Sequence, residues 1–338
     1  MIRVGLIGAG FMGKMHATCY EALKENGVMI TAVADLDQSK AGDIAEKSGA
    51  LVYETGMELI SQADVDAIDI CLPTYLHTEH AIAAMRNRKH VFIEKPVCLH
   101  EEDEKELLKT EKETGVTVMV GQCIRLWSEY TWLKKVTDSK EYGEIVTGVF
   151  KRISPKPTWS WNNWLHQPEL SGGVALDMHI HDADFVRFLL GEPDILSVNA
   201  SRDEEGVIQQ MFSTYKCQNA LLSSEVCWDY PDSFPFCMEY RVKFDKATAV
   251  YNSTVSPALM VYQNDGISFS PTLDKEFESD SNLGGNVSSL GGYYNELEYF
   301  INKIKNNEPV ETAPLSEGIN SVKMVLHEIA LAGGTVKL

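Results

Sequence analysis

Three glycines near the start of the chain are spaced for binding a dinucleotide phosphate. Gly8, Gly10 and Gly13 fit the pattern GxGxxG. The first glycine permits a tight turn, the second lets backbone approach a pyrophosphate, and the third lets a helix pack on a strand. An apolar, strand-like run precedes them, so Phe11 and Met12 are expected to open a helix whose N–H groups bind the phosphates. A glycine turn without a ligand is the plainer alternative.

An acidic residue stands where the ribose of such a cofactor would be held. Asp35 closes the second apolar run, about 20 residues after Gly13, where a carboxylate accepts hydrogen bonds from adenosine ribose hydroxyls. A carboxylate at this point repels a 2'-phosphate, and no arginine follows it in the segment LDQ. The two signals together predict NAD, rather than NADP, as the cofactor.

The segment CLPTYLH (71–77) is predicted to lie at the ligand-binding edge of the sheet. It ends an apolar run, and doubly wound folds bind ligands beyond the carboxyl ends of their strands. We therefore expect Pro73, Thr74 and His77 to contact the cofactor. A plain strand-to-helix turn is the alternative.

A charged pair ends the next apolar run. Glu94 and Lys95 follow residues 90–93, next to the expected position of the nicotinamide ring. Pro96 lacks an N–H and biases Lys95 toward an extended backbone, which gives the lysine a defined direction. A surface salt bridge is the alternative interpretation.

A second group of polar residues lies in the segment SGGVALDMHIHDAD (171–184). Asp177 and His181 are four residues apart, and Asp184 follows three residues later, so the three share one face of an α-helix. Asp177 and His181 can then act on one substrate atom. A buried core histidine is the plainer interpretation of His181.

The same segment superficially resembles a metal site, because it contains two histidines and an aspartate in the order HIHD. Helical spacing sends His179 and Asp182 away from the face that carries His181. We therefore predict no metal here, although a strand would restore the metal interpretation.

Three tryptophans lie just ahead of this helix, in WSWNNW (159–164). Indole faces stack on the apolar faces of sugars, so Trp161 and Trp164 are candidate substrate contacts. A buried hinge or a subunit contact is an equally good interpretation.

Strands alternating with helices in the first third of the chain predict a doubly wound parallel sheet. The strand-like runs are 2–7, 29–34, 67–71, 90–93 and 116–120, and the helical segments are 11–25, 76–87 and 101–114.

Beyond residue 121 the pattern changes to strands in series, which indicates an α+β domain with an open, largely antiparallel sheet. A helix over 174–190 precedes strand-like runs at 195–201, 207–215, 220–228, 236–244 and 247–251, and helices at 294–304 and 317–331 close the chain after a polar loop at 279–292. We predict a dinucleotide-binding Rossmann domain at 1–121 and a substrate-binding and oligomerisation domain at 122–338.

Composition excludes several classes of protein. The net charge of -19 disfavours nucleic acid and anionic membranes as partners, and no apolar run approaches the 18 or so residues of a membrane span. Glycines interrupt the apolar N-terminal run, which argues against a signal peptide. The 7 cysteines are odd in number and lack a CxxC pair, so we expect reduced thiols and a cytoplasmic location.

The motifs GAGFMG, EKP and GG followed by DxxxHxxD resemble, in order and spacing, the Gfo/Idh/MocA family of sugar and polyol dehydrogenases. The resemblance covers essentially the whole chain, and it implies Lys95, Asp177 and His181 as the catalytic set. Many relatives have a Phe-x-x-Arg-Phe segment after the last Rossmann strand. This chain reads GQCIRLW (121–127), which keeps Arg125 as a candidate substrate contact without its aromatic neighbours.

The resemblance implies oxidation of a secondary alcohol of a cyclic polyol or sugar. His181 would act as general base, Lys95 would stabilise alkoxide charge, and Asp177 would orient His181 or bind a neighbouring hydroxyl. The alternatives are a glycoside hydrolase or epimerase that uses NAD without net NADH formation, and a non-catalytic dinucleotide-binding regulator. The open sheet would expose a large apolar face, which predicts a homodimer or homotetramer.

Overall fold

The computed structural model describes residues 1–274 and 290–333 and divides them into two compact units. Unit 1 is Met1–Leu126 with the described part of Glu276–Asn320, and unit 2 is Trp127–Lys275 with the described part of Ser321–Leu338. Helix α10 (Leu315–Leu331) begins in unit 1 and ends in unit 2. The functional division at residue 121 stays a prediction.

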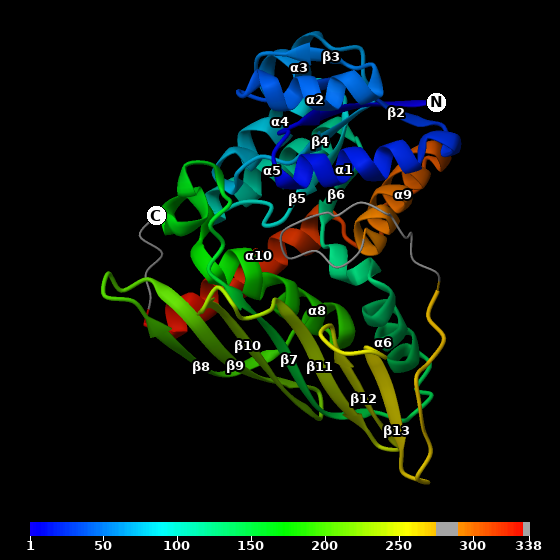
Figure 1. The fold of residues 1–338 in the computed structure, drawn as a ribbon, viewed down its shortest axis with the longest axis vertical. Coiled ribbons are helices and arrows are strands. Elements are labelled where there is room, and N and C mark those ends of the chain that lie inside the picture. Colours follow the sequence, from blue (N-terminus) through cyan, green and yellow to red (C-terminus); the bar gives the residue numbers. More distant parts are fainter. Residues whose placement is uncertain (275–289, 334–338) are drawn as a thin grey trace. The chain divides into compact units, whose positions relative to one another are not determined.

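Unit 1 is built on a parallel sheet of six strands in the order β3-β2-β1-β4-β5-β6 (Figure 1). The strands are β1 (Ile2–Ile7), β2 (Val28–Ala34), β3 (Leu51–Tyr53), β4 (Ala67–Ile70), β5 (His90–Glu94) and β6 (Val118–Gly121). This order reverses direction between β1 and β4, which is the point where doubly wound sheets bind dinucleotides.

Helices connect these strands, and local residues fix where several of them begin and end. They are α1 (Phe11–Ala22), α2 (Gln38–Ser48), α3 (Gly56–Gln62), α4 (His77–Arg86) and α5 (Glu101–Thr114). The Thr55 hydroxyl accepts a hydrogen bond from the Glu58 N–H at the start of α3, and the Glu58 carboxylate accepts one from the Glu54 N–H. This reciprocal capping satisfies backbone donors that the first turn leaves open.

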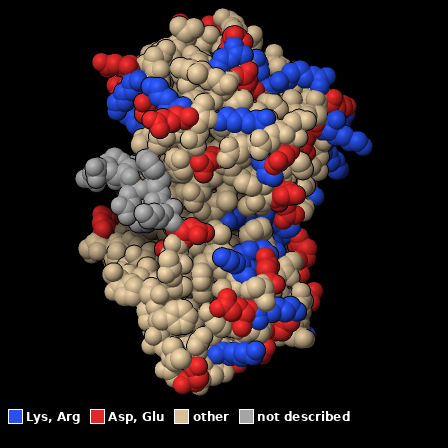
Figure 2. All heavy atoms as spheres, turned by 90° about the vertical axis from the view of Figure 1, so that its right-hand side faces the viewer, with Lys and Arg blue, Asp and Glu red and all other residues tan. Residues whose placement is uncertain are grey.

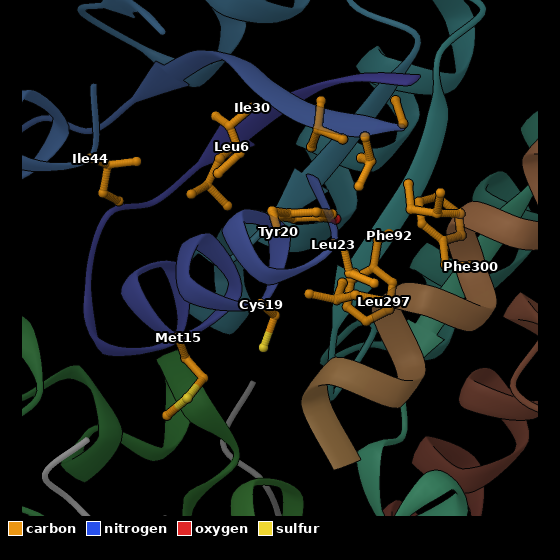
Figure 3. Packing of buried hydrophobic residues seen from close by; sticks show 14 of the residues in the cluster. Leu6, Met15, Cys19, Tyr20, Leu23, Ile30, Ile44, Phe92, Leu297 and Phe300 are labelled. Atoms are coloured by element: carbon orange, nitrogen blue, oxygen red, sulfur yellow. The ribbon is translucent and has the colours of Figure 1, made fainter. Parts of the chain in front are cut away.

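The core of unit 1 joins α1 to the sheet and to α9 (Gly291–Asn306). Figure 3 shows Tyr20 of α1 and Leu23, which caps the C-terminus of α1, together with Leu6 and Ile30 of the sheet. On the α9 side, the Phe92 and Phe300 rings meet edge to face with centroids 5.6 Å apart. This packing explains why α9, far along the chain, belongs to unit 1.

Unit 2 contains a sheet of eight strands in the order β14-β13-β12-β11-β7-β10-β9-β8. The strands are β7 (Ile145–Pro155), β8 (Asp194–Arg202), β9 (Ile208–Cys217), β10 (Ala220–Tyr230), β11 (Cys237–Phe244), β12 (Ala247–Asn252), β13 (Leu259–Gln263) and β14 (Ser268–Phe269). Only β7 and β10 pair in parallel among these described strands.

Two helices cover one face of this sheet, α6 (Ser128–Asp138) and α8 (Ile180–Leu190) (Figure 1). The Tyr130 ring of α6 meets Phe185 of α8 edge to face at a centroid distance of 4.8 Å and Tyr240 of β11 at 5.4 Å. A buried ion pair joins Arg152 of β7 to Asp182 of α8, with Arg152 Nε and Asp182 Oδ2 3.1 Å apart. Aromatic packing thus fixes α8, the helix that carries His181.

The opposite face of the sheet is open but less apolar than expected. Phe212 and Leu221 are about half exposed on it. Their cross-strand partners are charged, because Glu225 pairs with Phe212 and Lys216 pairs with Leu221. The expected large apolar surface is therefore a mixed one.

The predicted fold class is confirmed: a parallel α/β sheet and a largely antiparallel second sheet. The helix predicted over 174–190 contains a turn of π-helix, Ala175–His179, before α8. The patterns missed β3, α2, α3, α6, β7, β13, β14 and the short helix α7 (Pro168–Ser171). Residues 279–289 of the predicted loop lie outside the described part, whereas Gly291 and Gly292 start α9.

Charges of both signs are intermixed on the surface. Over the described residues on the face shown in Figure 2, Lys and Arg side chains lie beside Asp and Glu side chains. Within the described part of the chain, no helix combines the length and the apolar character needed to span a membrane.

Candidate active-site residues

The glycine turn of unit 1 has the shape that a dinucleotide phosphate requires. Gly8 has φ +95°, and a Cβ atom there would lie 2.5 Å from the Cys71 carbonyl oxygen. A Cβ atom on Gly13 would lie 1.8 Å from the Gly8 carbonyl oxygen, whereas one on Gly10 would meet nothing within 4 Å. Of these three glycines, only Gly10 therefore leaves open space beside it, at the N-terminus of α1. Phe11 and Met12 form the first turn of α1.

Asp35 lies directly after β2 and stabilises this turn by hydrogen bonds. Its Oδ2 accepts a hydrogen bond from the Ala9 N–H at 2.7 Å, and its Oδ1 accepts one from the Asp37 N–H at 2.8 Å. Each carboxylate oxygen can accept a second hydrogen bond, so these contacts leave capacity for ribose hydroxyls. The side chain is half-buried beside the glycines, as an NAD-binding acid requires.

His77 is buried and contacts the backbone of two turns, one at Leu72 and one at Pro96. Its Nδ1 lies 2.8 Å from the Pro96 carbonyl oxygen, and its Nε2 lies 2.8 Å from the Leu72 carbonyl oxygen. Burial lowers the pKa of His77, against the effect of these two carbonyl groups. Pro73 remains partly exposed on the same turn, while Thr74 is buried.

Lys95 lies at the carboxyl end of β5 and is partly exposed. Glu94, beside it, is buried, with 6% of its surface exposed, so the surface salt-bridge interpretation does not describe it. Its Oε2 accepts a hydrogen bond from the Lys95 N–H at 3.1 Å. Its Oε1 points inward and lies 3.2 Å from His16 Nε2.

His16 belongs to a buried polar cluster that sequence patterns did not reveal. Its Nδ1 lies 2.8 Å from Asp69 Oδ2 and 3.2 Å from Cys71 Sγ. Burial alone would lower the pKa of His16, but Asp69 and Cys71 raise it well above its usual range. Burial raises the pKa of Glu296 on α9, and the Glu94 carboxylate adds to this effect. The one sequence feature that could have revealed this cluster is Asp69, an aspartate inside the otherwise apolar strand AIDI (67–70).

Arg125 is buried within unit 1. Its Nη1 donates to the Thr312 carbonyl oxygen at 2.5 Å, and its Nη2 lies 3.3 Å from Glu317 Oε2. A guanidinium held in this way can reach a substrate only by breaking these contacts. Its predicted role as a substrate contact is thereby weakened.

In unit 2, the structure singles out Asp177 and His181. They are the only residues between Ser171 and Arg187 that are not buried. Asp177 lies in the π-helical turn, and His181 lies in the first turn of α8. π-Helical turns of this kind occur frequently at functional sites. The two residues form the accessible polar part of an otherwise buried helix.

The neighbouring polar residues of this helix have structural partners. His179 Nε2 lies 2.9 Å from Glu328 Oε2, and Asp182 pairs with Arg152. Asp184 is buried and accepts a hydrogen bond from the Ser321 hydroxyl at 2.6 Å. Asp184 is therefore a core residue rather than a continuation of the accessible face.

Replacing Glu328 with glutamine is expected to lower the free energy of unfolding at pH 7 by about 1–3 kcal/mol. Burial would raise the pKa of Glu328, but His179 and hydrogen bonds from His179, Ser213 and Tyr215 hold it below its ordinary value of 4.5. Because the folded pKa is lowered, this stabilisation is complete above about pH 4.5 and is lost as the pH falls further.

Urea unfolding of wild type and Glu328→Gln at several pH values tests this expectation. The difference in free energy of unfolding between the two proteins should become smaller below about pH 4.5. Glu205→Gln, at an exposed position in unit 2, is the matched control. A gap that stays constant down to pH 3 would contradict the assignment.

The tryptophan segment is exposed in unit 2. Trp161 is 51% exposed, and Trp164 is half-buried. Asn162 and Asn163 between them adopt left-handed backbone conformations, with φ 50° and 53°. Two successive non-glycine residues in this region store backbone strain, which is typical of sites under functional constraint.

Comparison with known proteins assigns the chain to a family. The profile described as "Oxidoreductase family, NAD-binding Rossmann fold" matches residues 2–122, and the GFO/IDH/MocA C-terminal domain matches residues 130–250. The chain belongs to the Gfo/Idh/MocA family. The N-terminal part is thus an NAD-binding Rossmann fold of an oxidoreductase family, which confirms the predicted family and cofactor.

Curated members of the family match a part of the chain. Inositol 2-dehydrogenase of Rhizobium meliloti (strain 1021) is 36% identical over 203 residues, which are 59% of this chain and 58% of that protein. The 2,7-anhydro-N-acetylneuraminate hydratase of Escherichia coli (strain K12) is 34% identical over 192 residues, 57% of this chain and 50% of that protein. The chain thus spans about half the length of these relatives.

Among solved structures, levoglucosan dehydrogenase in complex with NADH and levoglucosan superposes with a TM-score of 0.84. The identity is 21%, and the match covers 98% of this chain and 97% of that chain. At this identity the likeness supports the fold of both units.

Proposed function

We propose that the chain is an NAD-dependent dehydrogenase that oxidises a secondary alcohol of a cyclic, inositol-like polyol or a sugar to a ketone. The observation that carries the proposal is that Asp177 and His181 are partly exposed within the otherwise buried stretch from Ser171 to Arg187. These are the residues that the family motif assigns to chemistry. The glycine turn and Asp35 support NAD as the cofactor.

Each residue of the proposed site has a defined task. Bound NAD would supply the carbon that accepts a hydride. His181 takes the hydroxyl proton as general base, and Asp177 orients His181 or binds a neighbouring hydroxyl. Lys95 stabilises negative charge on the substrate oxygen. Gly8, Gly10, Phe11, Met12 and Gly13 hold the phosphates and Asp35 the ribose, while Pro73, Thr74, His77 and Glu94 shape the nicotinamide end.

Substrate contacts are proposed for Trp161 and Trp164, whose indole faces can stack on a sugar ring. Arg125 is retained as a proposed contact only if its bonds to Thr312 and Glu317 open. The proposed partners are a small polyol or sugar and further copies of the chain. We also propose a cytoplasmic location, because the 7 cysteines are free thiols.

A panel of inositols, sugars and sugar acids, each with NAD, tests the proposal by the absorbance of NADH. We expect NADH formation with at least one cyclic polyol or sugar. Sugar turnover without NADH formation would favour a redox-neutral use of the cofactor instead. Absence of both, with NAD bound, would overturn the proposal.

Self-association is expected through the open face of the unit 2 sheet. Phe212 and Leu221 are the exposed apolar residues that a partner copy would cover. Sedimentation velocity at micromolar concentration should show a dimer or tetramer, and Leu221→Lys with Phe212→Lys should shift it toward monomer. A wild-type monomer would refute this expectation.

A further inference from the structure

We propose that His16, Glu94 and Glu296 form a binding site for one divalent transition-metal ion inside unit 1. The three side chains come from α1, β5 and α9, and one ligand atom from each lies within 4.8 Å of the others. All three are at least nine-tenths buried, with exposed fractions of 0%, 6% and 0%. Glu94 adjoins the proposed catalytic Lys95, but the metal proposal does not rest on the proposed activity.

The atoms that face this site have no hydrogen-bond partner among the described residues. They are His16 Nε2, Glu94 Oε1 and both carboxylate oxygens of Glu296. A buried polar atom left in this state costs about 1–3 kcal/mol, and more when it is charged. One such atom from each of the three side chains lies within 4.8 Å of the others, so a single bound cation could satisfy them together.

The geometry between the first two ligands suits a metal ion. His16 Nε2 and Glu94 Oε1 are 3.2 Å apart, yet they are not placed as donor and acceptor of a hydrogen bond. Two ligands at about 2.0–2.1 Å from a tetrahedral ion lie roughly 3.3 Å apart. The observed distance between His16 Nε2 and Glu94 Oε1 matches the distance between two ligand atoms of such an ion.

The residues around His16 orient its ring so that Nε2 can bind a metal ion. Asp69 Oδ2 lies 2.8 Å from the other ring nitrogen, Nδ1. A carboxylate in this position keeps a proton on Nδ1, so that an incoming dication can displace the proton from Nε2 and bind there, with Asp69 as the usual second partner of a metal-binding histidine. The site is thus oriented by a residue that does not itself bind the ion.

The donor set indicates the class of ion. One imidazole nitrogen with two carboxylates suits zinc or a similar first-row ion, because imidazole disfavours magnesium and calcium. A dication also compensates the buried charges of Glu94, Glu296 and Asp69, which would otherwise be expensive to bury together. Bound in this way, the ion would tie α1 to β5 and α9.

Metal analysis of the full chain tests this site directly. The protein is produced with zinc in the medium, dialysed, and assayed for retained metal, and the apo protein is then titrated with Zn²⁺ and with Co²⁺ as a spectroscopic probe. Glu296→Gln preserves side-chain shape while weakening one ligand, and His16→Gln removes another. Glu298→Gln is the matched control, because Glu298 lies on the same helix and bonds to Asn26 instead.

We expect about one zinc ion per wild-type chain, a Co²⁺ spectrum of a nitrogen- and oxygen-ligated ion, and a higher Tm with metal. Glu296→Gln should bind at least tenfold more weakly, with a far-UV circular dichroism spectrum like that of wild type, and Glu298→Gln should bind normally. If His16→Gln does not fold, Glu296→Gln alone decides. No metal bound to wild type, or equal binding by Glu296→Gln, would overturn the proposal in favour of protons and water as the occupants.

Discussion

Replacing Lys95 with alanine is expected to lower the rate of sugar or polyol oxidation by at least about 10²-fold while NAD still binds. Lys95 follows the last residue of β5 and is partly exposed, at the carboxyl edge of the parallel sheet where doubly wound folds bind ligands. Removing the charge leaves the developing alkoxide without this stabilisation. The rate is measured by NADH absorbance, and NAD binding by quenching of tryptophan fluorescence.

Two further variants separate this effect from a general loss of charge. Lys95→Arg keeps the charge but changes its geometry, so it should retain part of the activity. Lys109→Ala removes a surface lysine that pairs with Glu106 in the same unit and should behave as wild type. Turnover of Lys95→Ala within twofold of wild type would disprove the assigned role.

Alanine substitutions at three glycines are expected to give three different outcomes. Gly10→Ala should leave stability near wild type but weaken NAD binding at least tenfold, because its methyl group enters the space that the pyrophosphate needs. Gly13→Ala should also destabilise the fold, since its Cβ atom would lie 1.8 Å from the Gly8 carbonyl oxygen.

Gly42→Ala provides the control. Gly42 lies inside α2, where an added Cβ atom meets nothing within 4 Å, so alanine should stabilise the helix by up to about 1 kcal/mol and leave NAD binding unchanged. Thermal unfolding and NAD titration of the three variants measure both quantities. Normal NAD affinity in Gly10→Ala would contradict the placement of the phosphates.

Local sequence patterns sufficed for the elements that carry strong periodicity. The runs that became β1, β2, β4 and β5 are mostly apolar segments, and their buried positions in the parallel sheet explain why they stand out. In unit 2, strands such as β9 alternate buried and less buried residues and were equally visible, whereas β7, β13 and β14 were not predicted. β3 was missed because it has only three residues at the edge of the sheet, two of them exposed.

Long-range contacts could not be predicted in the same way. Nothing near Glu296 in the sequence shows that α9 packs against α1, which lies far away along the chain. Arg125 was assigned to substrate on the basis of a motif, but its partners Thr312 and Glu317 come from the distant segment before and within α10. The position of a polar side chain thus depends on partners that a local pattern does not contain.

The π-helical turn at Ala175–His179 has a consequence for how this site could arise and be altered. A π-helical turn holds one residue more than an α-helical turn, so it behaves as a single-residue insertion in the helix. Each residue of an α-helix rotates the following side chain by about 100°. Deleting one residue between Asp177 and His181 would leave a continuous α-helix in which the two residues are three apart. Their side chains would then differ by about 60° around the helix axis, so their relative orientation would change without a change in the chemistry of either.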